Sequence, residues 1–129
     1  MIYLDTSAAL KLVLPEPESA ALELWLAERP VTPRISSRLL RIELLRTVNR
    51  YAAHRISRAQ TVLASIHLLS IDDVVPAAES IGDPTLRSLD AIHLATAHAL
   101  RTEVTSFVSY DKRLMDEAAR LGLPVTAPS

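Results

Sequence analysis

The chain has 129 residues, a formal net charge of −1 and no cysteine. This length fits one domain, which we place at residues 1–129, and the 49% hydrophobic content fits a buried core rather than disorder. Without cysteine, disulfides and thiolate chemistry are excluded, so a bound metal must use oxygen or imidazole ligands. No apolar run approaches the ~20 residues that cross a bilayer, and the first residues lack a signal-peptide pattern. We therefore expect a cytoplasmic protein without membrane contact.

Apolar runs, helical periodicity and proline or glycine punctuation predict alternating strands and helices. The first half is expected to contain strand 2–4, helix 8–14 capped by Thr6 and Ser7, helix 18–28, strand 34–37 and helix 38–54. The second half is expected to contain helix 57–69 capped by Ser57, strand 69–71, helix 75–81, a turn at 82–84, helix 88–101, strand 105–109, helix 111–121 and edge strand 123–126. Strands separated by helices predict an α/β fold with a mainly parallel sheet of four to five strands, covered by helices on both faces. With only two glycines, the chain has no glycine-rich phosphate loop.

Four acids are placed where such a fold would bring them together. Asp5 follows the first strand and Asp111 follows strand 105–109, so both should lie at the carboxyl ends of parallel strands, where ligands bind in open sheets. Asp90 falls in the first turn of its helix and Glu43 early in helix 38–54, from which both can reach the same rim. We therefore predict that these four carboxylates form one site.

Each acid taken alone also has a simpler interpretation. Asp5 and Asp111 fit helix caps, Asp90 fits a charge at a helix N-terminus, and Glu43 could pair with Arg46 or Arg50 on its own helix. Asp90 is the hardest to explain this way, because it lies in an otherwise apolar stretch where an unpaired charge is costly.

Converging carboxylates repel one another, and a divalent cation relieves that repulsion. Oxygen ligands of this kind suit Mg²⁺ or Mn²⁺, and a pair of such ions can activate water and stabilise the leaving oxygen in phosphodiester cleavage. His93 is spaced i, i+3 from Asp90, but a core or supporting histidine is the better interpretation on this alanine- and leucine-rich helix. No HExxH pattern or G-x-S-x-G turn points to zinc or serine hydrolysis.

The positive charge is concentrated in one segment. Between residues 34 and 58 there is a single acid, Glu43, among seven arginines: Arg34, Arg38, Arg41, Arg46, Arg50, Arg55 and Arg58. A solvated helical face is the plain interpretation of such a run. Next to an acidic site, however, Arg46 and Arg50 are candidates to hold the phosphates of RNA.

Four segments, in this order and at these separations, resemble the signature blocks of PIN domains, and the compact length resembles VapC toxins of bacterial VapBC toxin–antitoxin systems. The blocks are YLDTSA at 3–8, RIELLR at 41–46, SLDAIHLATA at 88–97 and FVSYDKRL at 107–114. The resemblance implies a three-layer α/β/α sandwich and an Mg²⁺- or Mn²⁺-dependent endoribonuclease that uses the same acidic quartet, Asp5, Glu43, Asp90 and Asp111. It also implies supporting roles for Thr6, Ser7 and Ser109, with Asp116 as an outer ligand. Ser109 stands where threonine is frequent, and the hydroxyl is retained.

The resemblance further implies partners. VapC-like proteins commonly form homodimers, and a VapB-type antitoxin inhibits them, giving a heterotetramer or a larger complex. The antitoxin tail typically lays an arginine into the acidic site and apolar side chains into an adjoining groove. We expect that groove near Leu10, Leu14, Trp25 and Leu45, although these residues fit a place in the core equally well.

Two other classes stay open on the residues alone. A receiver-like or haloacid-dehalogenase-like phosphotransfer domain also uses a rim aspartate and Mg²⁺, but Asp5 lacks the D-x-D-x-T arrangement and no lysine is well placed for a receiver. A catalytically silent binding protein could keep this fold and its partner contacts without cleaving RNA.

Overall fold

The computed structural model describes residues 1–129. Its strands are β1 (Ile2–Leu4), β2 (Arg34–Ser37), β3 (His67–Leu69), β4 (Ser106–Val108) and β5 (Val125–Thr126). Its helices are α1 (Thr6–Val13), α2 (Ser19–Ala27), α3 (Leu39–Tyr51), α4 (Ile56–Ala64), α5 (Val75–Ala78), α6 (Ser88–Ala99) and α7 (Lys112–Arg120), with a 3₁₀ turn at Ala53–Arg55. No helix combines the length and the apolar character that crossing a membrane requires.

All five strands run parallel, in the order β3-β2-β1-β4-β5. The register pairs Ile2 with Arg34 on one side of β1 and with Ser106 on the other. Parallel neighbours need a crossover between them, and helices supply most of these crossovers here. The mainly parallel sheet expected from the alternating pattern is therefore confirmed.

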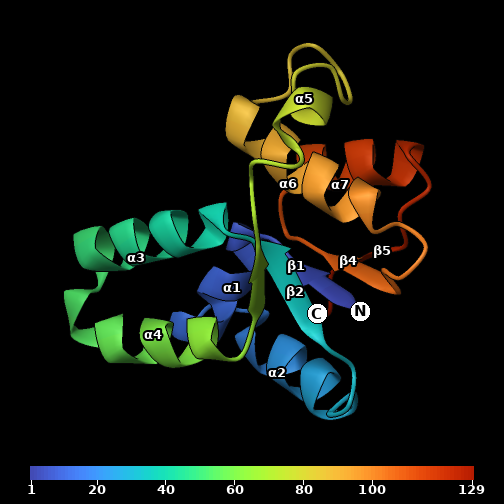
Figure 1. The fold of residues 1–129 in the computed structure, drawn as a ribbon. Helices are drawn as coiled ribbons and strands as arrows, with labels where there is room; N and C mark the ends of the chain where they lie inside the picture. Colours follow the sequence, from blue (N-terminus) through green and yellow to red (C-terminus); the bar gives the residue numbers. More distant parts are fainter.

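Successive residues of β1 serve two separate cores. Ile2 and Leu4 pack into a cluster with the buried faces of α1, α2, α3 and α4, whereas Tyr3 between them packs with α6, α7 and Phe107 on the other side. This follows from the period of two along a strand, which sends neighbouring side chains to opposite faces. Figure 1 shows the result as three layers, with α1 to α4 on one face of the sheet and α5 to α7 on the other.

Three predicted boundaries are wrong. The helix expected at 57–69 is α4, which ends at Ala64, and the strand expected at 69–71 is β3 at His67–Leu69. Val62, Ile66 and Leu69 do fit a helical period, but β3 pairs with β2 and this sheet contact decides the conformation. The helix expected at 75–81 is reduced to four residues, α5.

The predicted caps also differ. Thr6 and Ser7 are the first two residues of α1, and its N-cap is Asp5; α4 begins before Ser57, with Arg55 in the cap position and no side-chain cap bond.

Candidate active site

The site lies at the carboxyl ends of β1, the central strand, and of its neighbour β4. From β1 the chain moves outward to β2 and β3, and then returns to β4 on the opposite side of β1. The crevice where the order reverses is the usual ligand site of an open parallel sheet. Asp5 directly follows β1, while Ser109 and Asp111 follow β4, so the fold delivers these residues to the same edge.

Asp5 is buried, with 3% of its surface exposed, and three donors hold its carboxylate. Oδ1 accepts hydrogen bonds from the Ser7 hydroxyl (2.7 Å) and the Ala8 N–H (2.9 Å), and Oδ2 accepts one from the Ser109 hydroxyl (2.6 Å). Burial raises the pKa of Asp5, and the hydrogen bonds from Ser109 and Ser7 oppose that rise. The carboxylate is thus both a helix cap and a fixed, oriented acid.

Ser109 joins Asp5 to Asp111 across the two strands. Its hydroxyl donates to Asp5 and accepts the backbone N–H of Asp111 (3.1 Å). Asp111 is itself the N-cap of α7, where Oδ1 accepts from the Leu114 N–H (3.1 Å). The capping interpretations of Asp5 and Asp111 are therefore correct, but each cap uses Oδ1, and the other carboxylate oxygen is left for other contacts.

Glu43 pairs with a histidine rather than with an arginine on its own helix. Its Oε1 lies 2.7 Å from Nε2 of His93 and accepts a hydrogen bond from the Thr6 hydroxyl (2.7 Å). The local pair with Arg46, which the sequence allowed, is not formed. Burial would raise the pKa of Glu43, but the hydrogen bonds from His93 and Thr6 outweigh it and lower the pKa.

His93 is buried and is held on both ring nitrogens. Its Nδ1 lies 2.8 Å from the hydroxyl of Tyr3, and that hydroxyl also accepts the N–H of Ser37 (3.1 Å). Burial raises the pKa of Tyr3, so the hydroxyl stays protonated and donates a hydrogen bond to Nδ1. The tautomer that satisfies every contact therefore carries its proton on Nε2 and donates to Glu43.

Asp90 is the one acid of the four whose carboxylate accepts no hydrogen bond from the protein. It is half-buried in the first turn of α6, and charges rather than hydrogen bonds surround it. Burial raises its pKa, the nearby charges of Asp111 and Glu43 raise it further, and His93 and Arg87 oppose the rise. This local excess of negative charge is what a bound cation relieves.

All four predicted acids thus belong to one network of hydrogen bonds and short-range charge effects. No three acidic or histidine side chains come close enough to hold one ion directly. The donor set nevertheless fits Mg²⁺ or Mn²⁺: every donor is a carboxylate oxygen, and such ions retain several waters and bind directly through only one or two carboxylates.

The remaining predicted residues divide into two groups. Thr6, Ser7 and Ser109 all contact one of the acids directly. Asp116 is exposed on α7 and makes no hydrogen bond to any of the four acids. Arg46 and Arg50 are exposed on α3, outside the acidic network.

The sequence predicted that His93 is a core or supporting residue, and its burial agrees with that. The hydrogen bond from His93 to Glu43 and the one from the Tyr3 hydroxyl to His93 were not predicted. The i, i+3 spacing of Asp90 and His93, which places both on one face of α6, was the available signal.

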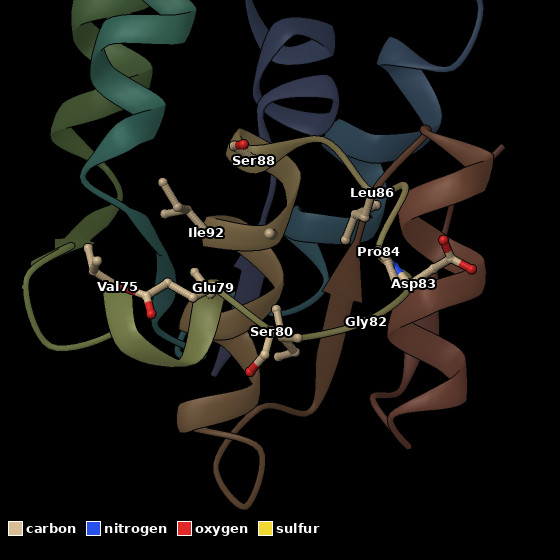
Figure 2. A pocket seen from close by; sticks show the side chains of 12 residues that line it. Val75, Glu79, Ser80, Gly82, Asp83, Pro84, Leu86, Ser88 and Ile92 are labelled. Atoms are coloured by element: carbon tan, nitrogen blue, oxygen red, sulfur yellow. The ribbon is translucent and has the colours of Figure 1, made fainter.

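A separate hollow of about 570 Å³ lies between α5, the 79–87 loop and α6. Figure 2 shows Val75 and Glu79 on one side of it and Ile92 on another, with Asp83 and Pro84 along the loop. None of the four acids lines it. Ser88 and Ile92 lie on the face of α6 opposite to Asp90 and His93, so this helix separates the hollow from the acidic network.

Residues 2–121 match the PIN domain family. The chain belongs to this family. It is 42% identical to "Ribonuclease VapC47" of Mycobacterium tuberculosis (strain CDC 1551 / Oshkosh) over 99% of this chain and 97% of that protein. It is also 42% identical to "Ribonuclease VapC35" of the same strain, with 99% and 97% covered, and to "Ribonuclease VapC46" of strain ATCC 25618 / H37Rv, with 99% and 98% covered. Within the PIN domains it is therefore of the VapC type, and a receiver-like or dehalogenase-like domain is excluded.

Proposed function

We propose that this PIN domain is the toxin of a type II toxin–antitoxin system and cleaves RNA as an Mg²⁺- or Mn²⁺-dependent endoribonuclease. The observation that carries the proposal is the acidic network at the switch point of the sheet, where Asp5 and Asp111 share Ser109 and Asp90 faces the charges of Asp111 and Glu43. The names of the VapC-type relatives support RNA as the substrate.

The chain's own residues divide the work in this proposal. Asp5, Asp90, Asp111 and Glu43 would hold the metal, one or two of them directly and the others through its bound waters. Ser7 and Ser109 fix the direction of the Asp5 carboxylate, and Thr6 and His93 do the same for Glu43. His93 is a positioning residue, because it reaches the reacting groups only through Glu43. Asp116 would act only as an outer ligand.

A divalent ion bound by these acids supplies a Lewis acid that activates water for attack and stabilises the leaving oxygen of the phosphodiester. Arg46 and Arg50 lie on the same helix as Glu43 and hold the RNA backbone beside the acids. The positive charge of these arginines next to the acids would draw the RNA backbone to the site, which the acids alone would repel.

The proposal includes a VapB-type antitoxin and a homodimeric toxin, in a heterotetramer or a larger complex. Leu10, Leu14, Trp25 and Leu45 are partly buried against the core of α1 to α4 and partly exposed, which supports them as a surface for an apolar antitoxin segment.

The decisive test compares wild type with Asp5→Asn. The purified proteins are incubated with RNA in Mg²⁺ or Mn²⁺ and then in EDTA, and RNA 5′ ends are sequenced after induced expression of each protein in cells. We expect new 5′ ends and cleavage in vitro with the wild type alone, and no cleavage in EDTA. Identical 5′ ends for the two proteins, together with no cleavage in either metal, would refute the nuclease and leave the catalytically silent binding protein.

A further inference from the structure

The C-terminal half of α3 carries an exposed aromatic ring in the most basic part of the chain. The protein has five Phe, Trp and Tyr residues, and Tyr51 is the only exposed one, with 69% of its surface accessible. Core packing therefore does not explain this ring. The Arg50 guanidinium lies 5.1 Å from the centre of the ring.

Tyr51 belongs to a face of α3 that starts at the candidate site. Counting from Glu43, the residues at i+3, i+4, i+7 and i+8 lie on the same side of a helix, and these are Arg46, Thr47, Arg50 and Tyr51. Tyr51 lies eight positions after Glu43, which is a rise of about 12 Å along the helix. The face therefore leads from the acids outward, over a distance that a few nucleotides can span.

This face is open and lined by polar groups. Arg46, Thr47, Asn49, Arg50 and Tyr51 border a groove of about 660 Å³. Neither arginine forms an ion pair with an acid, so both keep their charge for an external anion. Figure 1 shows the C-terminal half of α3 projecting beyond the sheet, with α4 along one side only.

We infer that this groove, defined by Arg46, Thr47, Asn49, Arg50 and Tyr51, binds single-stranded RNA, with a nucleobase stacked on Tyr51 and the backbone held by the arginines. The inference rests on the proposed ribonuclease function and adds a binding subsite to it. An aromatic ring within a cationic groove is how proteins bind single strands, because every base has a face to stack and every nucleotide has a phosphate. A duplex keeps its bases stacked on one another and offers none to Tyr51.

The test measures binding without cleavage. The probe is a single-stranded RNA of ~8 nucleotides that carries fluorescent 2-aminopurine, and the protein is the full chain with Asp90→Asn, in Mg²⁺. Fluorescence polarisation gives the Kd, and the quenching of 2-aminopurine reports stacking. Adding Tyr51→Ala should weaken binding by about 5- to 100-fold and remove the quenching. Adding Tyr51→Phe should preserve both, because the ring rather than the hydroxyl stacks.

Leu24→Ala is the matched control, since it removes another exposed apolar side chain, on α2, and should leave both signals unchanged. Tyr51 is exposed, so its loss should not unfold the chain, and circular dichroism checks this. Equal affinity and equal quenching for Tyr51→Ala and its parent would overturn the inference. So would a duplex RNA that binds as tightly as the single strand. Failure of the wild type to cleave any RNA would instead count against the proposed function, and the binding comparison does not depend on it.

Discussion

Asp90 lies half-buried in the first turn of α6, beside the charges of Asp111 and Glu43 and with no hydrogen bond to balance them. Its pKa is raised by burial and then by Asp111, so the folded protein binds this proton more tightly than the unfolded chain does. The free energy of unfolding therefore falls as the pH rises from the unfolded pKa through the folded pKa. In metal-free protein at neutral pH, the charge of Asp90 is a cost to the fold.

Asp90→Asn should accordingly raise Tm by a few degrees at neutral pH in EDTA, and the gain should shrink as the pH is lowered through that interval. The same variant should lose more than about 100-fold in RNA cleavage, because even substitutions that only support a metal site typically cost 10–100-fold. Thermal melts across pH and cleavage assays in Mn²⁺ measure the two effects. Full activity of Asp90→Asn would remove it from the ligands.

His93 allows a sharper test of positioning. His93→Ala removes one of the two side-chain donors of Glu43 and leaves Tyr3 without its acceptor inside a buried site, so we expect a lower Tm and about 10- to 100-fold weaker Mn²⁺ binding and cleavage. His93→Gln can still offer an N–H to Glu43 and should recover part of the Mn²⁺ affinity.

Calorimetric titration with Mn²⁺ separates this role from simple packing. If both variants bind Mn²⁺ as wild type does while losing stability equally, His93 serves the core alone. His98 on the same helix is a suitable control, since its imidazole is not among the hydrogen-bond or ion-pair partners of the four acids.

At the scale of the elements, the joint between β1 and β4 depends on Ser109. This fully buried hydroxyl donates to Asp5 and accepts from the N–H of Asp111, so it ties the start of α1 to the start of α7. Ser109→Ala should lower the free energy of unfolding by about 1–3 kcal/mol, because it leaves buried polar groups without a partner. Urea denaturation measures this loss. Ser65→Ala, which removes an exposed hydroxyl in the turn after α4, should lower the free energy of unfolding by less. An equal loss would show that the hydrogen bonds of Ser109 to Asp5 and Asp111 add no stability beyond that of an ordinary surface hydroxyl.

The elements also show where local sequence signals were sufficient. Ile2–Leu4 was predicted because it is a short apolar run, and the strand before Asp111 because β-branched and aromatic residues gather there; in both cases a helix cap follows. The boundary near Ile66 was missed because a helical period continues through Val62, Ile66 and Leu69, and a three-residue edge strand is too short to be told from a helix by its apolar positions. Only pairing with β2 distinguishes them, and that contact is not local in sequence.

For the whole molecule, alternation of strands and helices predicted the layers and the shared rim of Asp5 and Asp111, but not which partner Glu43 would choose. Arg46 was nearer in sequence, whereas His93 is fifty positions away and was brought close by the packing of α3 and α6. That acids following parallel strands meet at one edge of the sheet could be predicted from the sequence. Which donor bonds to Glu43 depends on which side chains are buried together, and the order of residues along the chain does not show that.

Charge distribution is the other property of the whole molecule that bears on function. The net charge is only −1, yet the segment from Arg34 to Arg58 holds seven arginines and one acid, and the acidic network begins at that one acid. A polyanion approaching the C-terminal half of α3 meets the positive charge of Arg46 and Arg50 first and the carboxylates only at Glu43, nearer the start of this helix. Binding should therefore be salt-dependent even though the protein as a whole is nearly neutral.

Charge reversal on α3 tests this distribution directly. Arg46→Glu or Arg50→Glu should weaken single-stranded RNA binding and reduce the slope of log Kd against log salt by roughly 0.7 for each phosphate that the variant no longer neutralises. Arg101→Glu makes the same change in net charge on an exposed turn after α6, away from the groove on α3. If net charge alone governed association, all three variants would shift the affinity and the slope equally. We expect the Arg101 variant to keep the wild-type slope, because a phosphate backbone leading to the acids passes over α3 and releases counterions only there.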